Sequence, residues 1–60
     1  MRLITQWYGG RDRGMGEIAA KIELSKHKKK YPQYIVTVED AGRQLQNGTQ
    51  AKKIVVRDPN

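Results

Sequence analysis

Residues 17–25, Glu-Ile-Ala-Ala-Lys-Ile-Glu-Leu-Ser, give the clearest structural signal in this chain of 60 residues. Ile18, Ala20, Ile22 and Leu24 alternate with mostly polar residues, and this period of two is typical of a half-buried strand. A helix is the rival interpretation, because Glu, Ala, Lys and Leu are good helix formers. On a helix, however, Leu24 would fall outside the apolar stripe that contains Ile18 and Ile22. The pattern therefore favours a strand.

Three further segments are rich in β-branched and aromatic residues, which is typical of strands. They are residues 3–8, 34–39 and 53–57. Asp40-Ala41-Gly42 is a tight-turn signal, and Asn47-Gly48 matches the positive φ angles of a type I′ hairpin turn. The polar residues 43–46 between these turns predict a short additional strand, with a brief helix over 40–46 as the alternative.

The spacing of these segments predicts five short strands joined by a long loop at 9–16 and a basic loop at 26–33. A small antiparallel barrel or curled sheet of the SH3-like or OB-like type is the simplest closed arrangement, because it limits exposed edges. The expected class is therefore all-β, in one domain over residues 1–60. The helix at 40–46 would make it a β-rich α+β fold instead.

The composition is strongly basic, with 12 Lys and Arg against 6 Asp and Glu, a net charge of +6 and a pI near 10. Residues 1–30 hold eight basic and three acidic side chains, so the first half carries +5 of this charge. Such an excess attracts anionic partners. A chain this short has a small core and no cysteine to reinforce it. Completion of the core by a second copy, as a homodimer, is therefore open.

The basic run at 26–30 is followed at once by Tyr31 and, three residues later, Tyr34. Positive charge beside aromatic faces suits a phosphate backbone and its bases. The glycine-rich loop at 9–16 adds two arginines that can make forked contacts to phosphate. The candidate nucleic-acid contacts are Arg11, Arg13, Lys26, Lys28, Lys29, Lys30, Tyr31, Tyr8, Lys53 and Arg57. The competing interpretation is a solvated lysine cluster that suppresses aggregation at strand ends.

Catalytic and metal-binding motifs are missing from the sequence. His27 is the single histidine, and no thiolate or second imidazole accompanies it. We expect it to be a solvent-exposed loop residue. The glycines at 9–16 match neither a P-loop, which needs a Lys after its second glycine, nor a dinucleotide site, which needs a βαβ unit. The sequence thus predicts neither an enzyme nor a cofactor, and no residue is assigned to catalysis or to a metal.

The leading hypothesis is a small nucleic-acid-binding protein that contacts phosphates with low sequence specificity. DNA and RNA, and single and double strands, stay open, because all of them present phosphates. The alternative is a small regulatory or inhibitory protein that docks on an acidic surface of a protein partner. No segment approaches the ~20 apolar residues of a membrane span, and no signal peptide is evident. We therefore expect no membrane partner and a cytoplasmic location.

Overall fold

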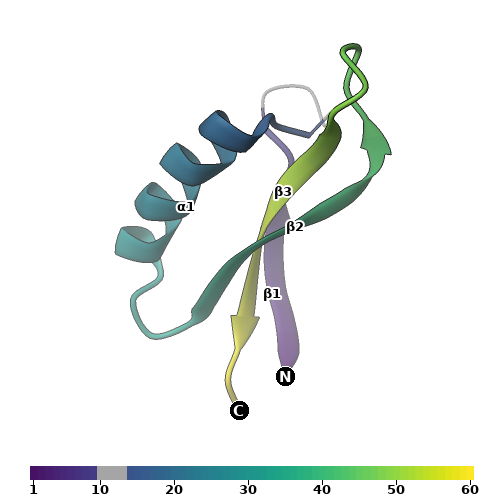
Figure 1. Ribbon diagram of the computed structural model, residues 1–60. Helices are drawn as coiled ribbons and strands as arrows, with labels where there is room; N and C mark the ends of the chain where they lie inside the picture. The colour runs from purple at the N-terminus through teal and green to yellow at the C-terminus, as the bar shows by residue number, and fades with distance from the viewer. Residues whose placement is uncertain (10–13) are drawn as a thin grey trace.

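The computed structural model describes residues 1–9 and 14–60. Within these residues the chain forms three strands and one helix, shown in Figure 1. Their order is β1 (Arg2–Trp7), α1 (Glu17–Lys30), β2 (Ile35–Gln44) and β3 (Gln50–Asp58). β3 lies between β1 and β2 and pairs antiparallel with both. β1 and β2 therefore run parallel to each other on either side of β3, joined by α1.

The predicted closed barrel of five strands is wrong. The described residues form an open sheet of three strands with one helix, which is a small β-rich α+β fold. Three of the predicted strands are confirmed as β1, β2 and β3, namely those at 3–8, 34–39 and 53–57. Their β-branched residues favour a strand and pack against residues of the neighbouring strands. The segments at 17–25 and 43–46 do not form the other two strands.

Residues 17–25 belong to α1 rather than to a strand. The side of the helix that meets the sheet includes Ala20, Leu24, His27 and Tyr31, a spacing of four, three and four residues that suits a helix. Ile18 is 79% exposed and lies on the outer side. The alternation of apolar residues was therefore misleading, because half of them face solvent.

α1 continues through Lys30, so the predicted basic loop at 26–33 is also wrong. Glu17 lies in the first turn, and His27 and three lysines occupy the last turn. Acidic side chains at the N-terminus and basic ones at the C-terminus both stabilise a helix through its dipole. Pro32 follows the end of the helix. Proline has no backbone N–H to donate, so the helix cannot continue past it. The lysine run thus ends a helix.

Residues 40–46 form neither the predicted turn at 40–42 nor the alternative helix. β2 passes through Asp40 and Gln44, which pair with Lys52 and Gln50 of β3. From Asp40 to Gln44 the chain advances four residues in β2, while the paired segment of β3 advances two, so β2 contains an irregular bulge. Gly42 lies in it with φ +81°, an angle that glycine adopts without strain.

The hairpin between β2 and β3 lies where Asn47-Gly48 predicted it, with a different turn register. The N–H of Gly48 donates to the carbonyl of Leu45 at 2.9 Å, and the N–H of Leu45 donates to the carbonyl of Thr49 at 2.8 Å. Gln46 and Asn47 are therefore the central turn residues, and Gly48 follows with φ +84°. This pattern is a three-residue hairpin loop rather than a two-residue type I′ turn.

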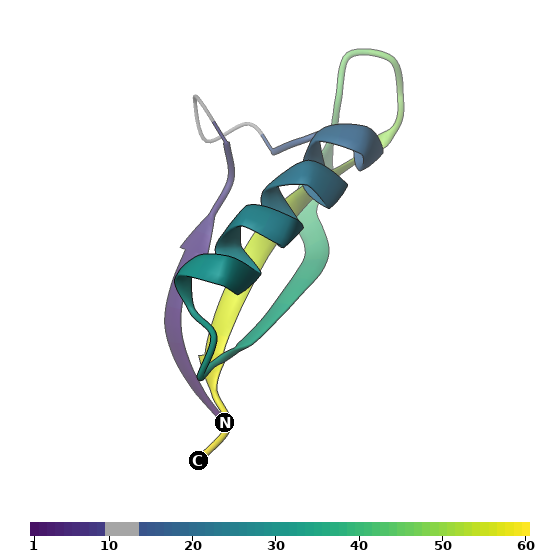
Figure 2. The same ribbon diagram turned by 90° about the vertical axis from the view of Figure 1, so that its left-hand side faces the viewer.

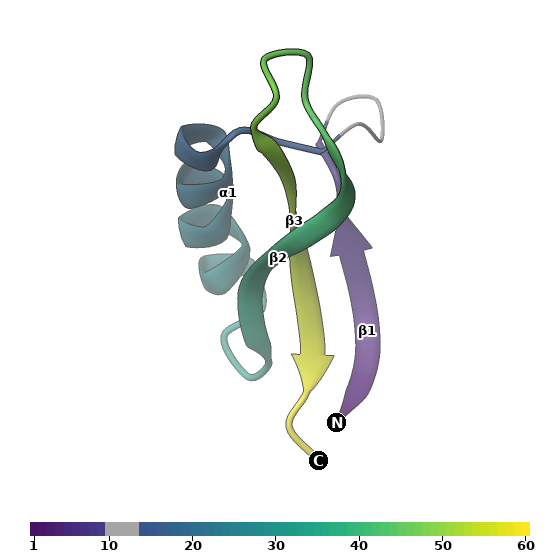
Figure 3. The same cartoon turned by 45° about the vertical axis from the view of Figure 1, so that its right-hand side comes forward.

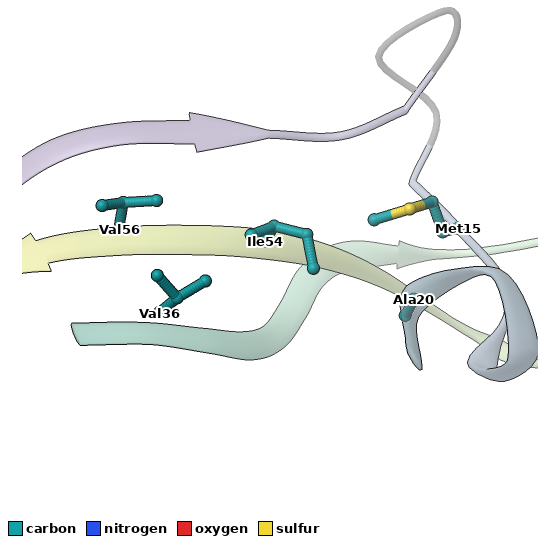
Figure 4. Packing of buried hydrophobic residues seen from close by; sticks show 5 residues of the cluster. All are labelled: Met15, Ala20, Val36, Ile54 and Val56. Atoms are coloured by element: carbon teal, nitrogen blue, oxygen red, sulfur yellow. The ribbon is translucent and has the colours of Figure 1, made fainter. Parts of the chain in front are cut away.

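The core lies between α1 and the sheet and is shown in Figure 4. It contains Met15, Ala20, Val36, Ile54 and Val56, and all five are at most 7% exposed. Val36 and Val56 are paired across neighbouring strands, so one face of the sheet forms one side of the core. Figure 2 shows α1 lying across this face, and Figure 3 shows no helix over the opposite face. The two faces of the sheet therefore present different residues to solvent.

Candidate nucleic-acid interface

The described basic side chains differ in whether a carboxylate neutralises them. Each Asp and Glu in residues 1–9 and 14–60 pairs with one Lys or Arg. The pairs are Arg2–Asp58, Lys21–Glu17, Lys26–Glu23, Lys52–Asp40 and Arg57–Glu39. Lys28, Lys29 and Lys30 have no carboxylate partner among the described residues and are exposed. Three uncompensated charges therefore lie at the end of α1, whereas Lys53, which also lacks a carboxylate partner among the described residues, bonds to Gln6 elsewhere.

We call Lys26, Lys28, Lys29 and Lys30 the basic end of α1. Successive helix residues are about 100° apart around the axis, so Lys28, Lys29 and Lys30 project in three directions rather than forming one flat patch. Lys26 and Lys30 are four residues apart and project toward the same side. That side meets β1.

A cleft of about 310 Å³ lies at this side, between β1 and the last turns of α1. We call it the Trp7 cleft; its lining residues are Thr5, Trp7, Lys26, His27, Lys30 and Tyr31. It combines two ammonium groups with three aromatic rings. A larger hollow of about 710 Å³ lies beside the β2–β3 hairpin. Among the described residues, Arg43 is the single charged residue that lines it, and none of its lining residues is aromatic. The Trp7 cleft is therefore better suited to bind an anion that carries a ring.

The aromatic rings of the Trp7 cleft form a continuous series. The Trp7 and His27 ring centroids are 5.3 Å apart, and those of His27 and Tyr31 are 6.3 Å apart with planes inclined by 21°. Tyr31 also meets Tyr34 at 6.2 Å and packs against the core. These separations lie in the range of favourable aromatic pairs. The series joins β1 to the end of α1 and holds both tyrosines in the structure.

His27 is not the exposed loop residue that we expected. Its side chain is 16% exposed, and its Nδ1 lies 2.8 Å from the backbone carbonyl oxygen of Glu23. A carbonyl oxygen can only accept a hydrogen bond, so Nδ1 carries the hydrogen and donates it. Nε2 is then the ring nitrogen that remains for a ligand. Our expectation failed because the neighbouring lysines suggested a loop, whereas His27 is on the inner side of a helix.

A second group of predicted contacts lies on the sheet face opposite α1. Residues of β3 alternate between faces, so Lys53 and Arg57 point away from the face that carries Ile54. Lys53 Nζ donates to Gln6 Oε1 at 2.8 Å and lies 5.2 Å from the centroid of the Tyr8 ring. Tyr8 and Lys53 thus interact with each other on this face.

Arg57 makes a two-pronged ion pair with Glu39 on the same face. The hydrogen bond from Arg57 holds the pKa of Glu39 below its ordinary value, although partial desolvation opposes this shift. The same contact raises the pKa of Arg57. The charge of Arg57 is therefore already compensated by a carboxylate.

The structure divides the predicted contacts into separate groups. Lys26, Lys30 and Tyr31 meet in the Trp7 cleft, and Lys28 and Lys29 surround the same helix end. Tyr8, Lys53 and Arg57 lie together on the opposite face of the sheet. The predicted contacts Arg11 and Arg13 lie outside the described residues.

Trp7, Thr5 and His27 are cleft residues that the sequence reasoning did not assign to the site. A helical interpretation of 26–31 would have aligned Lys26 with Lys30 and His27 with Tyr31. No comparable signal connects β1 with α1, because about 20 residues separate Trp7 from His27 in the chain.

Within the described residues, no group of three His, Asp or Glu side chains is arranged to hold a metal ion. Over the same residues, no helix combines the length and the apolar character needed to cross a bilayer. Comparison of the chain with protein-family profiles, with curated proteins and with solved structures found no match in any of the three.

Proposed function

We propose that this chain is a small nucleic-acid-binding protein that contacts the phosphate backbone with low sequence specificity through the basic end of α1. The observation that supports this function most directly is the distribution of charge. Lys28, Lys29 and Lys30 are exposed and lack carboxylate partners among the described residues, whereas every described carboxylate is paired elsewhere. A concentration of uncompensated lysines attracts a polyanion.

The helix dipole opposes this attraction only in part. The C-terminus of a helix carries the equivalent of about half a negative charge, and the lysines of the last turn stabilise that end. Three full positive charges exceed this partial charge several-fold. The lysines can therefore stabilise the helix and still present a positive surface.

Low sequence specificity follows from the side chains that α1 presents. Specific reading of base edges relies on the paired donors and acceptors of Arg, Asn and Gln. α1 contains none of these residues. A lysine ammonium is a compact point charge that suits phosphates of any sequence. The proposed contacts therefore recognise the backbone rather than the bases.

A salt titration of affinity tests the proposal. We measure the binding of fluorescent oligonucleotides, single-stranded and duplex, by anisotropy over a series of salt concentrations. Each phosphate that a lysine neutralises adds about 0.7 to 0.9 to the slope of log K against log salt. Lys28→Gln should reduce the slope by about that amount, and joint replacement of Lys28, Lys29 and Lys30 by Gln by about 2 to 3.

Lys21→Gln is the matched control. Lys21 lies seven residues before Lys28 on the same side of α1, about 10 Å away along the axis, and it pairs with Glu17. The Lys21→Gln variant should leave the slope of log K against log salt unchanged. Equal effects of the Lys21 and Lys28 variants, or no binding of any oligonucleotide at low salt, would contradict the proposal.

The docking of this chain on an acidic protein predicts a different outcome. A protein partner captured from a lysate should then survive nuclease treatment, and polyglutamate should compete with the oligonucleotide at equal concentration of charge. The nucleic-acid proposal expects capture to be lost after nuclease treatment and polyglutamate to compete weakly, because it offers no rings to the Trp7 cleft.

A further inference from the structure

From the geometry we infer that the Trp7 cleft binds one unstacked base of a single-stranded nucleic acid, with Trp7 as the stacking surface and Lys26 and Lys30 beside the flanking phosphates. This inference rests on the proposed function and names its substrate class. A base in a duplex is covered on both faces by its neighbours, so a cleft of this kind favours single strands.

The position of Trp7 supports the inference first. Trp7 is 39% exposed, although it lies on the face of the sheet that α1 covers. One part of the ring meets His27, and β1 holds the residue in register with Ile54 of β3. A large aromatic ring that is fixed by a strand and left partly open is a suitable platform for a base. Tyr31 is less suitable, because it packs against the core.

The charge around Trp7 supports the inference next. Lys26 and Lys30 are one helical turn apart, about 6 Å along the axis, and both line the cleft. Lys26 lies 3.6 Å from Glu23 and is partly compensated by it, whereas Lys30 has no carboxylate partner among the described residues. Lys30 should therefore contribute more to phosphate binding than Lys26.

The size of the cleft limits its occupant. A volume of about 310 Å³ lies at the lower end of the range for small-molecule sites. It suits one nucleotide and excludes a double helix. His27 forms part of the wall with its Nδ1 bonded to the backbone, so Nε2 is the nitrogen that can bond the base or its phosphate.

The intrinsic fluorescence of Trp7 provides the test, because it is the one tryptophan of the chain. We titrate the protein with a single-stranded thymidine oligonucleotide and with an abasic oligonucleotide of equal length, which keeps the phosphates and lacks the bases. We expect quenching with the first and not with the second, and an affinity about 5- to 150-fold lower for the abasic strand.

Variants separate stacking from folding. Trp7→Leu should lose affinity for the thymidine strand by about 5- to 150-fold, measured with a labelled oligonucleotide. Trp7→Tyr keeps a ring and should retain most of the affinity. Gln6→Ala changes the residue before Trp7, which lies on the opposite face of the sheet, and should bind as the wild type does. Circular dichroism confirms that each variant is folded.

The possible results distinguish the inference from the proposed function. Equal affinity for the thymidine and abasic strands, without quenching, would overturn the inference and leave phosphate binding by the basic end of α1 intact. Tighter binding of duplex than of single strand would also overturn it. Failure of every oligonucleotide to bind at low salt would overturn both.

Discussion

Ile54 and Ile18 are the same residue type at opposite extremes of exposure, and their replacement by alanine tests the fold directly. Ile54 is fully buried in the sheet beneath α1, whereas Ile18 is 79% exposed on the outer side of the helix. Truncation of a buried isoleucine to alanine costs about 2–5 kcal/mol, because it removes apolar contacts and leaves a cavity. At 60 residues the whole fold has roughly 3–9 kcal/mol of stability. Ile54→Ala should therefore remove between about a fifth and all of it.

Ile18→Ala should change the free energy of unfolding by less than about 0.5 kcal/mol. The side chain buries little surface, and alanine has a higher helix propensity than isoleucine. Urea unfolding followed by circular dichroism measures both variants, with the slope of free energy against urea as a check on two-state behaviour. Should Ile54→Ala fail to fold, Ile54→Val is expected to cost about 0.5–1.5 kcal/mol and remains measurable. A loss of 2 kcal/mol or more from Ile18→Ala would contradict the placement of Ile18, because a residue on the outer side of α1 has no core contacts to lose. Such a result would restore the strand interpretation of residues 17–25.

Two further predictions concern pH and glycine. Because Arg57 lowers the pKa of Glu39 in the folded state, this carboxylate contributes stability above its ordinary pKa of about 4.5, and the contribution is lost as the pH falls below that value. Wild-type protein should lose more thermal stability between pH 6 and pH 3 than Glu39→Gln, and equal losses would contradict the ion pair. Gly14→Ala should destabilise the fold more than Gly48→Ala, as measured by thermal unfolding. Both glycines have φ above +80°, which costs an alanine about 1 kcal/mol. A Cβ on Gly14 would also lie 2.5 Å from that of Ala51, whereas nothing lies within 4 Å of a Cβ on Gly48.

The strands were predictable because their signals are local. Residues 34–39 and 53–57 are rich in valine and isoleucine, and such residues favour a pleated, buried backbone wherever they pair. Trp7 and Tyr8 are consecutive, and they lie on opposite faces as alternation requires. Asn47-Gly48 marked the hairpin correctly, although the hydrogen bonds place the turn one residue earlier.

The helix was not predicted, although part of its signal was present. Glu17 near its start, the lysines at its end and Pro32 beyond it all agree with a helix. The alternation of Ile18, Ala20, Ile22 and Leu24 outweighed them, because we assumed that all four are buried. In the structure Ile18 and Ile22 are exposed, and only packing against the sheet determines which of the four reach the core.

The sequence alone determined the basic character of this protein, the three strands and the residue types available for a phosphate contact. These properties depend on composition and on patterns within a few residues. Tertiary packing set three further features. Residues 26–30 end a helix, Trp7 meets His27, and one group of predicted contacts lies away from that helix end, namely Tyr8, Lys53 and Arg57. Contacts of that kind join distant parts of the chain, and they form because α1 must cover the apolar face of the sheet. The same packing that buries Ala20 and Leu24 places two lysines beside an open tryptophan ring.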